Sequence, residues 1–409
     1  MLSALWHPSS SPTSVLRALG GAAEAAPIKT PLYDFHLAHS GSMVPFAGYS
    51  LPVLYKKDVV GGVLPEHLHT RSHCTIFDVS HMGQIKWTGK DRASFLEKCV
   101  VSDVAGLKTG EGLLSLITNA KGGIIDDTVI ANSGDYIYMV VNGACKHKDM
   151  AHFKNMLAAN KHMDVKMTYM EESLALLAVQ GPLSAKVIAP FLPDGGANLR
   201  KMGFMTGADM TFAGVPGCRV TRCGYTGEDG FEISIPASRS VEVAEKLTKQ
   251  DGVQLAGLGA RDSLRLESGL CLYGNDLDET ITPVEAGLSW TMGGPKGRRR
   301  LEGGGFLGCE HVLTKDGKLV KGTRKRVGFA GMKAPARAHT IVYDASGTKK
   351  IGEITSGTFG PSLKKAVAMG YVEEGYEGTA VKLDIRGKMA DAEITKMPFG
   401  KTNYFRAEA

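Results

Sequence analysis

The chain has 409 residues, of which 43% are hydrophobic and 22% are charged, and its formal net charge is +6. This length is enough for two or three domains with their own cores, and the composition is ordinary for a globular protein. No stretch approaches the roughly 18 consecutive apolar residues of a membrane span, so a membrane-spanning protein is excluded. The small positive charge suits an acidic protein or an anionic small molecule, and it is too dispersed to indicate nucleic acid.

The first 28 residues differ in composition from the rest of the chain. They are rich in Ser and Ala and carry one basic residue, Arg17, and one acidic residue, Glu24. This composition resembles a cleavable organelle transit peptide, although a single Arg is weak for that class. A disordered tail is the alternative. We therefore interpret 1–28 as a leader and expect the folded protein to start at residue 29.

Cysteine and histidine spacing gives no support for a metal site. The seven cysteines are odd in number and scattered, without a CxxC pair, so they indicate neither a disulfide framework nor a zinc site. A reducing compartment fits this usage. His67, His69 and His73 lie close together with Cys74 and His81, but His67 and His69 would diverge on a helix and no Glu lies between His69 and His73. We predict no metal and expect helix-face or core roles for these histidines.

Helix and strand signals are mixed without a regular order up to about residue 191. Scattered helical signals run from Leu51 to Asp78, and an amphipathic helix is expected from Lys146 to Lys161. A strand is expected in LALLAVQG (174–181) and a further helix from Pro182 to Phe191. Between them the turn-separated runs GQIKWTG, LLSLITN, IIDDTVI and YIYMVV favour short strands. Because no βαβ rhythm occurs, the predicted class is α+β.

Two adjacent aspartates, Asp126 and Asp127, stand in the expected strand IIDDTVI. Neighbouring residues on a strand point to opposite faces, so only one of them is expected to reach a given pocket. Paired acid and base chemistry of the glycosidase kind is therefore not expected. Asp126 is expected to be a turn-side or outer-face acid.

The most informative stretch runs from Arg222 to Trp290 and places charged residues within an apolar frame. Glu232 follows the glycine-rich turn GEDG and opens the strand-like FEISIP. Arg261 and Arg265 share one face of an expected helix, with Asp262 as N-cap and Gly269 after its C-terminus. A carboxylate can grip a planar pair of N–H donors, such as a pterin edge, and Arg offers the reverse fork to a carboxylate. The alternative is that Glu232 pairs with a surface lysine and Arg261 braces the helix.

The C-terminal part of the chain changes character after a glycine-rich basic stretch at 293–305. Its run KGRRR (296–300) is interpreted as a flexible, solvated loop. Short alternating strands separated by turns follow, which indicates a small barrel or sandwich. These strand-like runs are RVGFAGM, TIVYDA, KIGEITSG, AVAMGYV, AVKLDIRG and ADAEITKM.

Several motifs longer than ten residues occur in one order between about Thr30 and Phe405. They are TPLYDFHLAHSGSMVPFAGYSLPV, HTRSHCTIFDVSHMGQ, NAKGGIIDDTVI, the stretch from Arg222 to Trp290, ITSGTFGPSLKKAVAMGYV and KMPFGKTNYF. In this order the chain closely resembles the aminomethyltransferase family, the T proteins of the glycine cleavage system. Departures are few: Tyr49 replaces the usual Trp of the GWSLP motif, and the basic stretch at 293–305 is unusually long.

The resemblance implies a two-lobed folate-binding portion over 29–295 and a small C-terminal β-barrel domain over 306–405. It implies that Asp127 is the catalytic residue near folate N10 and that Glu232 grips the pterin edge. Arg261, and less directly Arg326, would face the anionic glutamate end of the folate. Candidates for the pocket walls, for which core packing is an equal alternative, are Tyr404, Tyr138, Met82 and Trp290.

The implied reaction takes an aminomethyl group from the lipoylated carrier (H) protein, releases ammonia and forms 5,10-methylenetetrahydrofolate. Tetrahydrofolate is then the co-substrate, no metal is involved, and neither nucleic acid nor membrane is a partner. The family's residence implies the mitochondrial matrix, in agreement with a leader at 1–28.

Two other classes of function compete with this interpretation. One is a folate-binding relative with another task, such as iron–sulfur assembly or demethylating oxidation. The chain has no KGC-type motif for the first, and for the second Gly257-Leu258-Gly259 lacks the third glycine of a dinucleotide fingerprint. The other class is a non-catalytic scaffold that docks the carrier, and the joint presence of Asp127, Glu232 and Arg261 argues against it.

Overall fold

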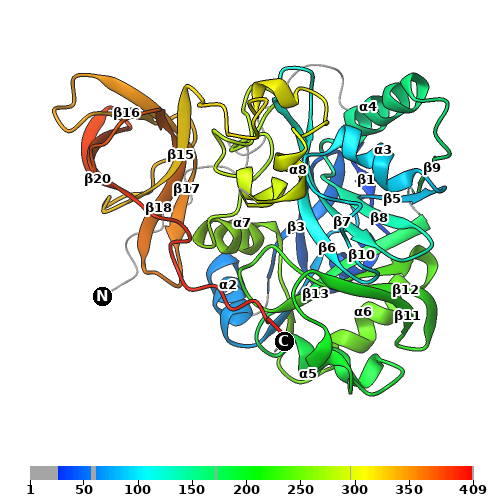
Figure 1. Ribbon diagram of the computed structural model, residues 1–409. Coiled ribbons are helices and arrows are strands. Elements are labelled where there is room, and N and C mark those ends of the chain that lie inside the picture. Colours follow the sequence, from blue (N-terminus) through cyan, green and yellow to red (C-terminus); the bar gives the residue numbers. More distant parts are fainter. Residues whose placement is uncertain (1–25, 57–60, 171–172, 295, 408–409) are drawn as a thin grey trace.

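The computed structural model describes residues 26–56, 61–170, 173–294 and 296–407, so all but the last three residues of the predicted leader (1–28) lie outside the described residues. Two large sheets and a small three-stranded sheet form the larger body, and a closed barrel stands beside it (Figure 1). The expectation of an α+β protein with a two-lobed portion and a C-terminal barrel is confirmed. The domain boundaries 29–295 and 306–405 stay predictions.

The first lobe is built on a six-stranded sheet with a large apolar core. Its strands, in spatial order, are β11 (Thr206–Phe212), β12 (Val215–Arg222), β13 (Gly230–Pro236), β10 (Leu174–Gln180), β4 (Cys74–Asp78) and β14 (Val253–Leu255). Helices α5 (Ser184–Ile188) and α6 (Ser240–Thr248) pack against it, and Phe212 and Phe231 fill the interior. The strand expected in FEISIP is thus confirmed as β13, which pairs antiparallel with β10 and places Ala178 opposite Glu232.

The second lobe is built on a five-stranded sheet. In spatial order its strands are β6 (Gly112–Thr118), β7 (Ile124–Asn132), β8 (Ile137–Val141), β5 (Gly83–Thr88) and β9 (Lys166–Tyr169). The four strands expected between Val79 and Val141 and the helix expected from Lys146 are confirmed, the latter as α4 (Lys146–Ala159). Helix α3 (Arg92–Cys99) was not expected, and its Phe95 packs on Trp87 in the core of this lobe.

The segment from Leu51 to Asp78 is only partly helical, so that expectation is wrong over much of its length. Helix α2 covers Val63–Ser72, but Tyr49–Tyr55 forms β3 of a small sheet with β1 (Ile28–Lys29) and β2 (Gly41–Phe46), preceded by α1 (Tyr33–Ala38). Residues Tyr49–Tyr55 are extended because β3 pairs with β2, a contact that local sequence does not reveal.

Helix α7 (Leu258–Glu267) lies between the barrel and the two sheets (Figure 1). The predicted helix is confirmed, and Gly269 adopts the positive φ of 69° expected after its C-terminus. The predicted N-cap is wrong, since the helix begins at Leu258 and Gly257 precedes it. A Cβ on Gly257 would lie 2.4 Å from the carbonyl carbon of Val53, so glycine here allows α7 to approach β3 closely.

The barrel is closed by six strands. In spatial order they are β15 (Arg324–Ala330), β18 (Lys365–Glu373), β17 (Lys350–Gly360), β16 (Ile341–Tyr343), β19 (Ala380–Ile385) and β20 (Lys388–Thr395). Buried Arg265 of α7 joins the barrel to the larger body, because it pairs with Asp276 at 2.7 Å and donates to Ser356 Oγ at 2.9 Å. The predicted small barrel is confirmed, and α7 is its connection to the larger body.

The basic stretch at 296–300 is not the solvated loop expected from its sequence. Residues Arg298–Leu301 form a short helix, α8. Arg298 pairs with Asp103 at 2.6 Å and with Glu97, while the buried Arg299 donates to the backbone oxygen of Glu97 at 2.5 Å. Two of the three arginines therefore hold α8 against the second lobe.

Five short 3-10 helices complete the described elements: Ala189–Phe191, Leu199–Lys201, Ala237–Arg239, Ser289–Met292 and Cys309–His311.

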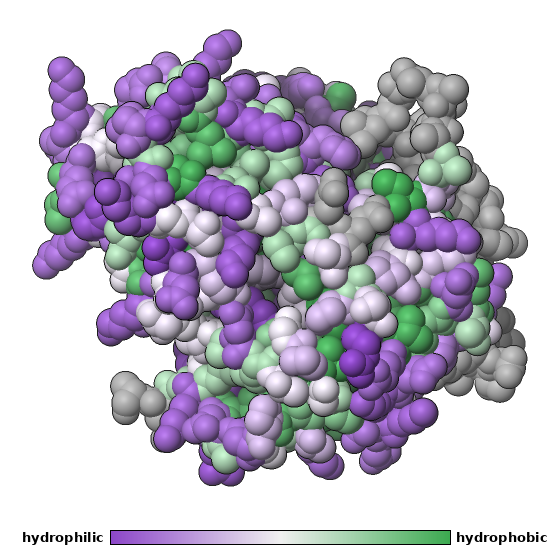
Figure 2. Space-filling model, turned by 90° about the vertical axis from the view of Figure 1, so that its right-hand side faces the viewer, coloured by the Kyte–Doolittle hydropathy of each residue, from purple (hydrophilic) through white to green (hydrophobic). Residues whose placement is uncertain are grey.

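The outer face of the two lobes is mostly hydrophilic. Viewed from the side of α4 and β9, apolar side chains are dispersed among polar ones (Figure 2). Within the ranges that the structure describes, no helix is long and apolar enough to cross a membrane.

Candidate functional site

Glu232 of β13 and Arg261 of α7 carry opposite charges in the interior between the lobes. Burial raises the pKa of Glu232, and the charge of Arg261 opposes this rise. Burial likewise lowers the pKa of Arg261, opposed by the charge of Glu232. Among the described residues neither side chain forms an ion pair, and Nη1 of Arg261 is buried without a hydrogen-bond partner. Because unpaired buried donors and charges are costly, this arrangement indicates a place where a polar ligand binds.

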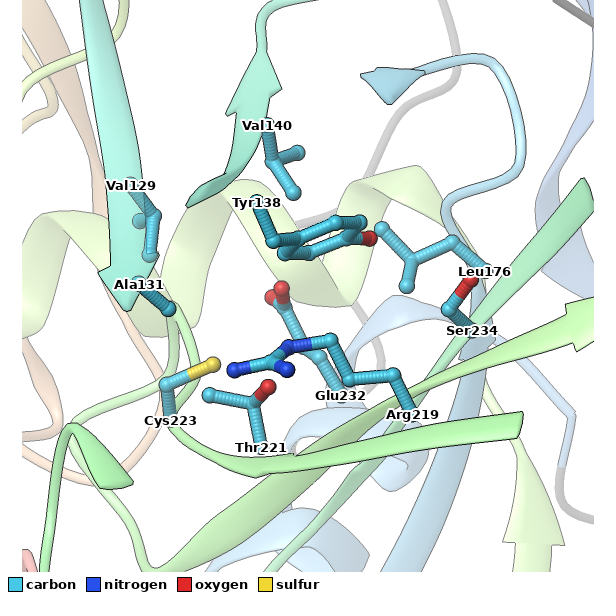
Figure 3. Close-up of a pocket in the computed structure, with 10 residues that line it drawn as sticks. All are labelled: Val129, Ala131, Tyr138, Val140, Leu176, Arg219, Thr221, Cys223, Glu232 and Ser234. Carbon is cyan, nitrogen blue, oxygen red and sulfur yellow. The ribbon is translucent and has the colours of Figure 1, made fainter. Parts of the chain in front are cut away.

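A cavity between the two sheets contains the Glu232 side chain (Figure 3). The ring of Tyr138 and the guanidinium of Arg219 point into it together with the Glu232 carboxylate. The guanidinium carbon of Arg219 lies 5.1 Å from the centroid of the Tyr138 ring, and its Nε and Nη2 atoms have no partner. The other residues that line the cavity are Val129, Ala131, Val140, Leu176, Thr221, Cys223 and Ser234. An aromatic wall beside a carboxylate and a guanidinium is the kind of lining that a flat, polar ring needs. The open volume in this structure is about 10 Å³, room for about one water molecule, so a ring would enter only after these side chains move apart.

Asp127 lies on β7, and the pKa of its carboxyl group is higher than that of an ordinary aspartate. Burial raises its pKa from 3.8 to about 7, and the negative charge of Asp126 adds to this effect. The Nδ2 group of Asn142 donates to Asp127 Oδ1 at 2.8 Å, which opposes the rise. A carboxyl group with a pKa near neutrality can accept or return a proton under physiological conditions.

Asp126 is not the outer-face or turn-side acid that the sequence suggested. It is 0% exposed, and the same Asn142 amide donates to its Oδ1 at 2.9 Å. The backbone N–H of Asn142 also donates to Asp126 Oδ2 at 2.9 Å. Asn142 directly follows the neighbouring strand β8, and its side-chain amide donates to the carboxyl groups of both Asp126 and Asp127.

Tyr225 lies between the Asp127 region and the charged side chain of Arg261. The Arg261 guanidinium lies 4.8 Å from the centroid of the Tyr225 ring, and the hydroxyl donates to the backbone oxygen of Cys271. Burial raises the pKa of Tyr225, and the charges of both Arg261 and Asp127 act on it. The sequence analysis missed Tyr225, although it stands in the GYTGEDG run directly before Glu232.

Of the other predicted site residues, Met82 and Arg326 lie near this region. Met82 packs against the apolar cluster that includes Tyr138. Arg326 of β15 donates to the backbone oxygens of Ala286 at 2.7 Å and Gly269 at 3.2 Å. The charges of Arg326 and Asp127 both act on Cys271, whose pKa burial raises to about 12.

Tyr404 and Trp290 are not brought together with these residues. The Tyr404 ring packs on Phe204 with 4.3 Å between centroids, and its charged neighbours are Arg71 and Glu228. Trp290 is 59% exposed at the surface. The structure thus assembles Asp127, Glu232, Arg261, Tyr138 and Met82 in the interior with Arg326 at the edge, and it adds Arg219, Tyr225 and Asn142.

Three of the histidines singled out in the sequence have structural partners, whereas Nδ1 of His81 is buried without a hydrogen-bond partner. His67 contacts Ser263 at 2.7 Å and Glu267 at 3.2 Å, while the rings of His69 and His73 stack at 4.7 Å. No group of three or more side chains suited to hold a metal ion occurs within the ranges described above.

The fold and the site together define an α+β enzyme with a buried polar site between two lobes and a separate closed barrel. Residues 32–296 match the family model described as the GCVT N-terminal domain, and residues 324–401 match the glycine cleavage T-protein C-terminal barrel domain. The chain therefore belongs to the glycine cleavage T-protein family, the aminomethyltransferases of the glycine cleavage system.

Relatives from distant organisms agree with this assignment. The mitochondrial aminomethyltransferase of Homo sapiens is 49% identical over 92% of this chain and 91% of its own length. The one from Pisum sativum is 47% identical over 92% and 90%. The crystal structure of the glycine cleavage system aminomethyltransferase T from Bartonella henselae matches with a TM-score of 0.83 and 36% identity, covering 93% of this chain and 100% of that one. The family, the fold class and the class of enzyme predicted from the sequence are confirmed.

Proposed function

We propose that the interior site binds tetrahydrofolate and transfers to it the methylene of a lipoyl-bound aminomethyl group. The observation that carries this proposal is the pair of opposite, largely buried charges on Glu232 and Arg261, which form no ion pair and are linked through Tyr225 to an aspartate whose pKa is about 7. The Glu232 carboxylate and the Arg261 guanidinium suit recognition of a polar ligand, and the Asp127 carboxyl group suits proton transfer.

The two charged groups complement the two edges of a pterin ring. Glu232 accepts from the adjacent N–H groups of the ring, and Arg261 donates to its carbonyl oxygen. The electrostatic contact between Glu232 and Arg261 supports a shared position at the pterin end. The sequence had suggested the glutamate end for Arg261, and we now assign that end to Arg326 alone. Tyr138 and Met82 form the wall against which the ring lies, whereas Tyr404 and Trp290 have no part in this binding mode.

The chemistry exchanges two bonds at one carbon. The methylene carbon loses its bonds to the amine nitrogen and to the lipoyl sulfur, and it gains bonds to folate N5 and N10. The two protons of N5 and N10 leave with ammonia and with the dihydrolipoyl thiol, so that the step balances. Asp127 as a carboxylate stabilises positive charge at the folate amine and takes up its proton. Holding both substrates in near-attack geometry lowers the barrier further.

The remaining partners follow from the same assignment. The protein partner is the lipoylated carrier (H) protein, whose lipoyl arm must reach the interior site. The relatives are named mitochondrial, which supports residence in the mitochondrion, and we propose the matrix as the compartment. The leader at 1–28 would direct the chain there.

An ammonia-release assay tests the proposal. Purified protein is incubated with aminomethylated H protein, with and without tetrahydrofolate, and ammonia and methylenetetrahydrofolate are measured together. We expect folate to stimulate release strongly, with one methylenetetrahydrofolate per ammonia. Release that does not respond to folate, or ammonia without the folate product, would overturn the proposed reaction.

A further inference from the structure

A third buried aspartate lies behind the Asp127 region. Asp149 sits in the first turn of α4 and is 0% exposed, as is Asp126. Neither of its carboxyl oxygens accepts a hydrogen bond from an N–H or O–H group of the described residues. The carboxyl groups of Asp149 and Asp126 nevertheless lie within hydrogen-bonding reach of each other. Two ionised carboxylates cannot share such a contact, so one of them holds a proton.

The surrounding donors decide which of the two holds the proton. Asp126 already accepts from the backbone and side-chain N–H groups of Asn142, at 2.9 Å each, and from the Cys145 thiol. Asp149 accepts from none of these groups. A hydrogen-bonded carboxylate is stabilised as the anion, whereas a buried one without donors is favoured as the acid. Burial raises the pKa of both acids. The hydrogen bonds to Asp126 oppose its rise, whereas the charge of Asp126 adds to the rise of Asp149, whose pKa reaches about 10.

A continuous set of contacts leads from Asp149 to the reacting region. As the acid, Asp149 can donate to Asp126, which lies within hydrogen-bonding reach. Asp126 accepts from the backbone N–H of Asn142 through Oδ2 and from the side-chain Nδ2 of Asn142 through Oδ1. The same amide nitrogen donates to Asp127 Oδ1 at 2.8 Å. A change in the charge or position of Asp126 is therefore passed directly to Asp127.

We propose that Asp149 is a positioning residue for the transfer reaction: as a neutral acid it keeps Asp126 anionic, and through Asn142 it fixes the orientation and the charge state of Asp127. This inference rests on the proposed role of Asp127 as the group that handles the folate proton. It assigns a function to a buried acid that touches neither substrate.

Charged and titratable groups from several elements face this cluster. Lys148 of α4 acts on Asp149, and its Nζ lies 3.3 Å from Glu279. The groups that act on Asp126, Asp127 or Asp149, or are acted on by them, are Cys145, Lys148, Tyr225, Cys271 and Tyr273. Because Lys148 is the one cation among them, a proton on Asp149 limits the negative charge that the cluster must hold.

The decisive measurement is the pH dependence of folate-stimulated ammonia release. Asp149→Asn keeps a neutral N–H donor toward Asp126, so we expect the acidic limb of kcat to stay where it is in wild type. Asp149→Ala removes the donor, so the pKa of Asp126 rises and Asp126 takes up a proton from solvent. Without the negative charge of Asp126, the acidic limb of Asp127 is expected to shift to lower pH by about one unit. His152→Gln, one turn further along α4, is the matched control and should not move the limb.

Two outcomes would overturn the inference while leaving the proposed reaction intact. One is a folded Asp149→Ala variant with an unmoved limb, and the other is an equal shift in Asp149→Asn and Asp149→Ala. If Asp149→Ala does not fold, infrared spectroscopy of wild type and Asp149→Asn decides. We expect the carbonyl band of a protonated buried acid at pH 8 in wild type and its loss in Asp149→Asn, and persistence of the band in the variant would refute the assignment. Absence of folate-stimulated release in wild type would instead contradict the proposed function.

Discussion

Replacing Asp127 with Asn tests the site most directly, because it is expected to abolish turnover and to increase stability. Asn keeps the shape of the side chain and an oxygen that can accept from Asn142. It cannot take up a proton from folate. General acid–base and electrostatic roles of this kind are worth roughly 10²–10⁴ in rate, so we expect a loss of that size in kcat with folate binding largely retained.

The raised pKa of Asp127 sets the pH dependence of the wild-type rate. With a pKa of about 7 and the carboxylate as the active form, kcat rises through neutrality. At pH 6 about a tenth of the enzyme is ionised at this position, and at pH 8 about nine tenths is. The decrease in kcat as the pH falls through about 7 should be absent from the residual activity of Asp127→Asn.

The same pKa shift predicts the change in stability. A carboxyl group whose pKa is higher in the folded state than in the unfolded chain supports folding below pH 4, and this support is lost as the pH rises through 7. A shift of about three units corresponds to about 4 kcal/mol as an upper limit. Asn does not ionise, so the Asp127→Asn variant does not lose stability in this way as the pH rises. The variant should therefore be more stable than wild type at pH 8, and the difference should vanish near pH 4.

The assay combines ammonia release at saturating folate with urea unfolding at pH 4, 6 and 8. Asp135→Asn serves as the matched control, since Asp135 is exposed in the turn that follows the same strand. A folded Asp127→Asn enzyme with a near wild-type rate at pH 8 would refute the catalytic assignment. An unchanged or lower stability at pH 8 would refute the explanation of its pKa.

Three further variants test the remaining assignments. Glu232→Ala should weaken tetrahydrofolate binding about tenfold to a hundredfold in calorimetry, because a charge-assisted contact is worth about 1.5–3 kcal/mol, while Glu245→Ala on the surface should not. Arg261→Ala should weaken a pterin fragment and full tetrahydrofolate alike; a loss confined to the tailed ligand would return Arg261 to the glutamate end. Asp276→Ala removes the buried ion-pair partner of Arg265 and leaves only the exposed Asp262, so it should cost about 3–5 kcal/mol in urea unfolding. Its control is Asp262→Ala, which removes the 53% exposed partner of the same arginine and should cost less than about 1 kcal/mol.

Local sequence was sufficient to predict those strands and helix ends that are marked by alternating hydrophobic residues, turn residues or glycine. Alternating runs bounded by turns predicted the barrel strands and β13, since one buried face imposes a period of two. Gly269 marked the end of α7 because glycine adopts a positive φ without cost. Long ordered motifs also identified the family, and with it Asp127, Glu232 and Arg261.

Only the tertiary structure decided which of these groups meet. Asp126 was expected to point away from Asp127, because the alternation of side chains along a strand follows from local sequence alone. Asn142, which follows the neighbouring strand, nevertheless donates to both carboxyl groups. The stretch at 296–300 looked solvated because its composition is basic and glycine-rich, whereas Glu97 and Asp103 from the second lobe pair with it. The proton on Asp149 depends on a buried neighbour that follows no spacing rule in the sequence. Charge compensation and burial are properties of contacts between distant segments, so the sequence determined the elements and the family, and the folded contacts determined the charge states of the site.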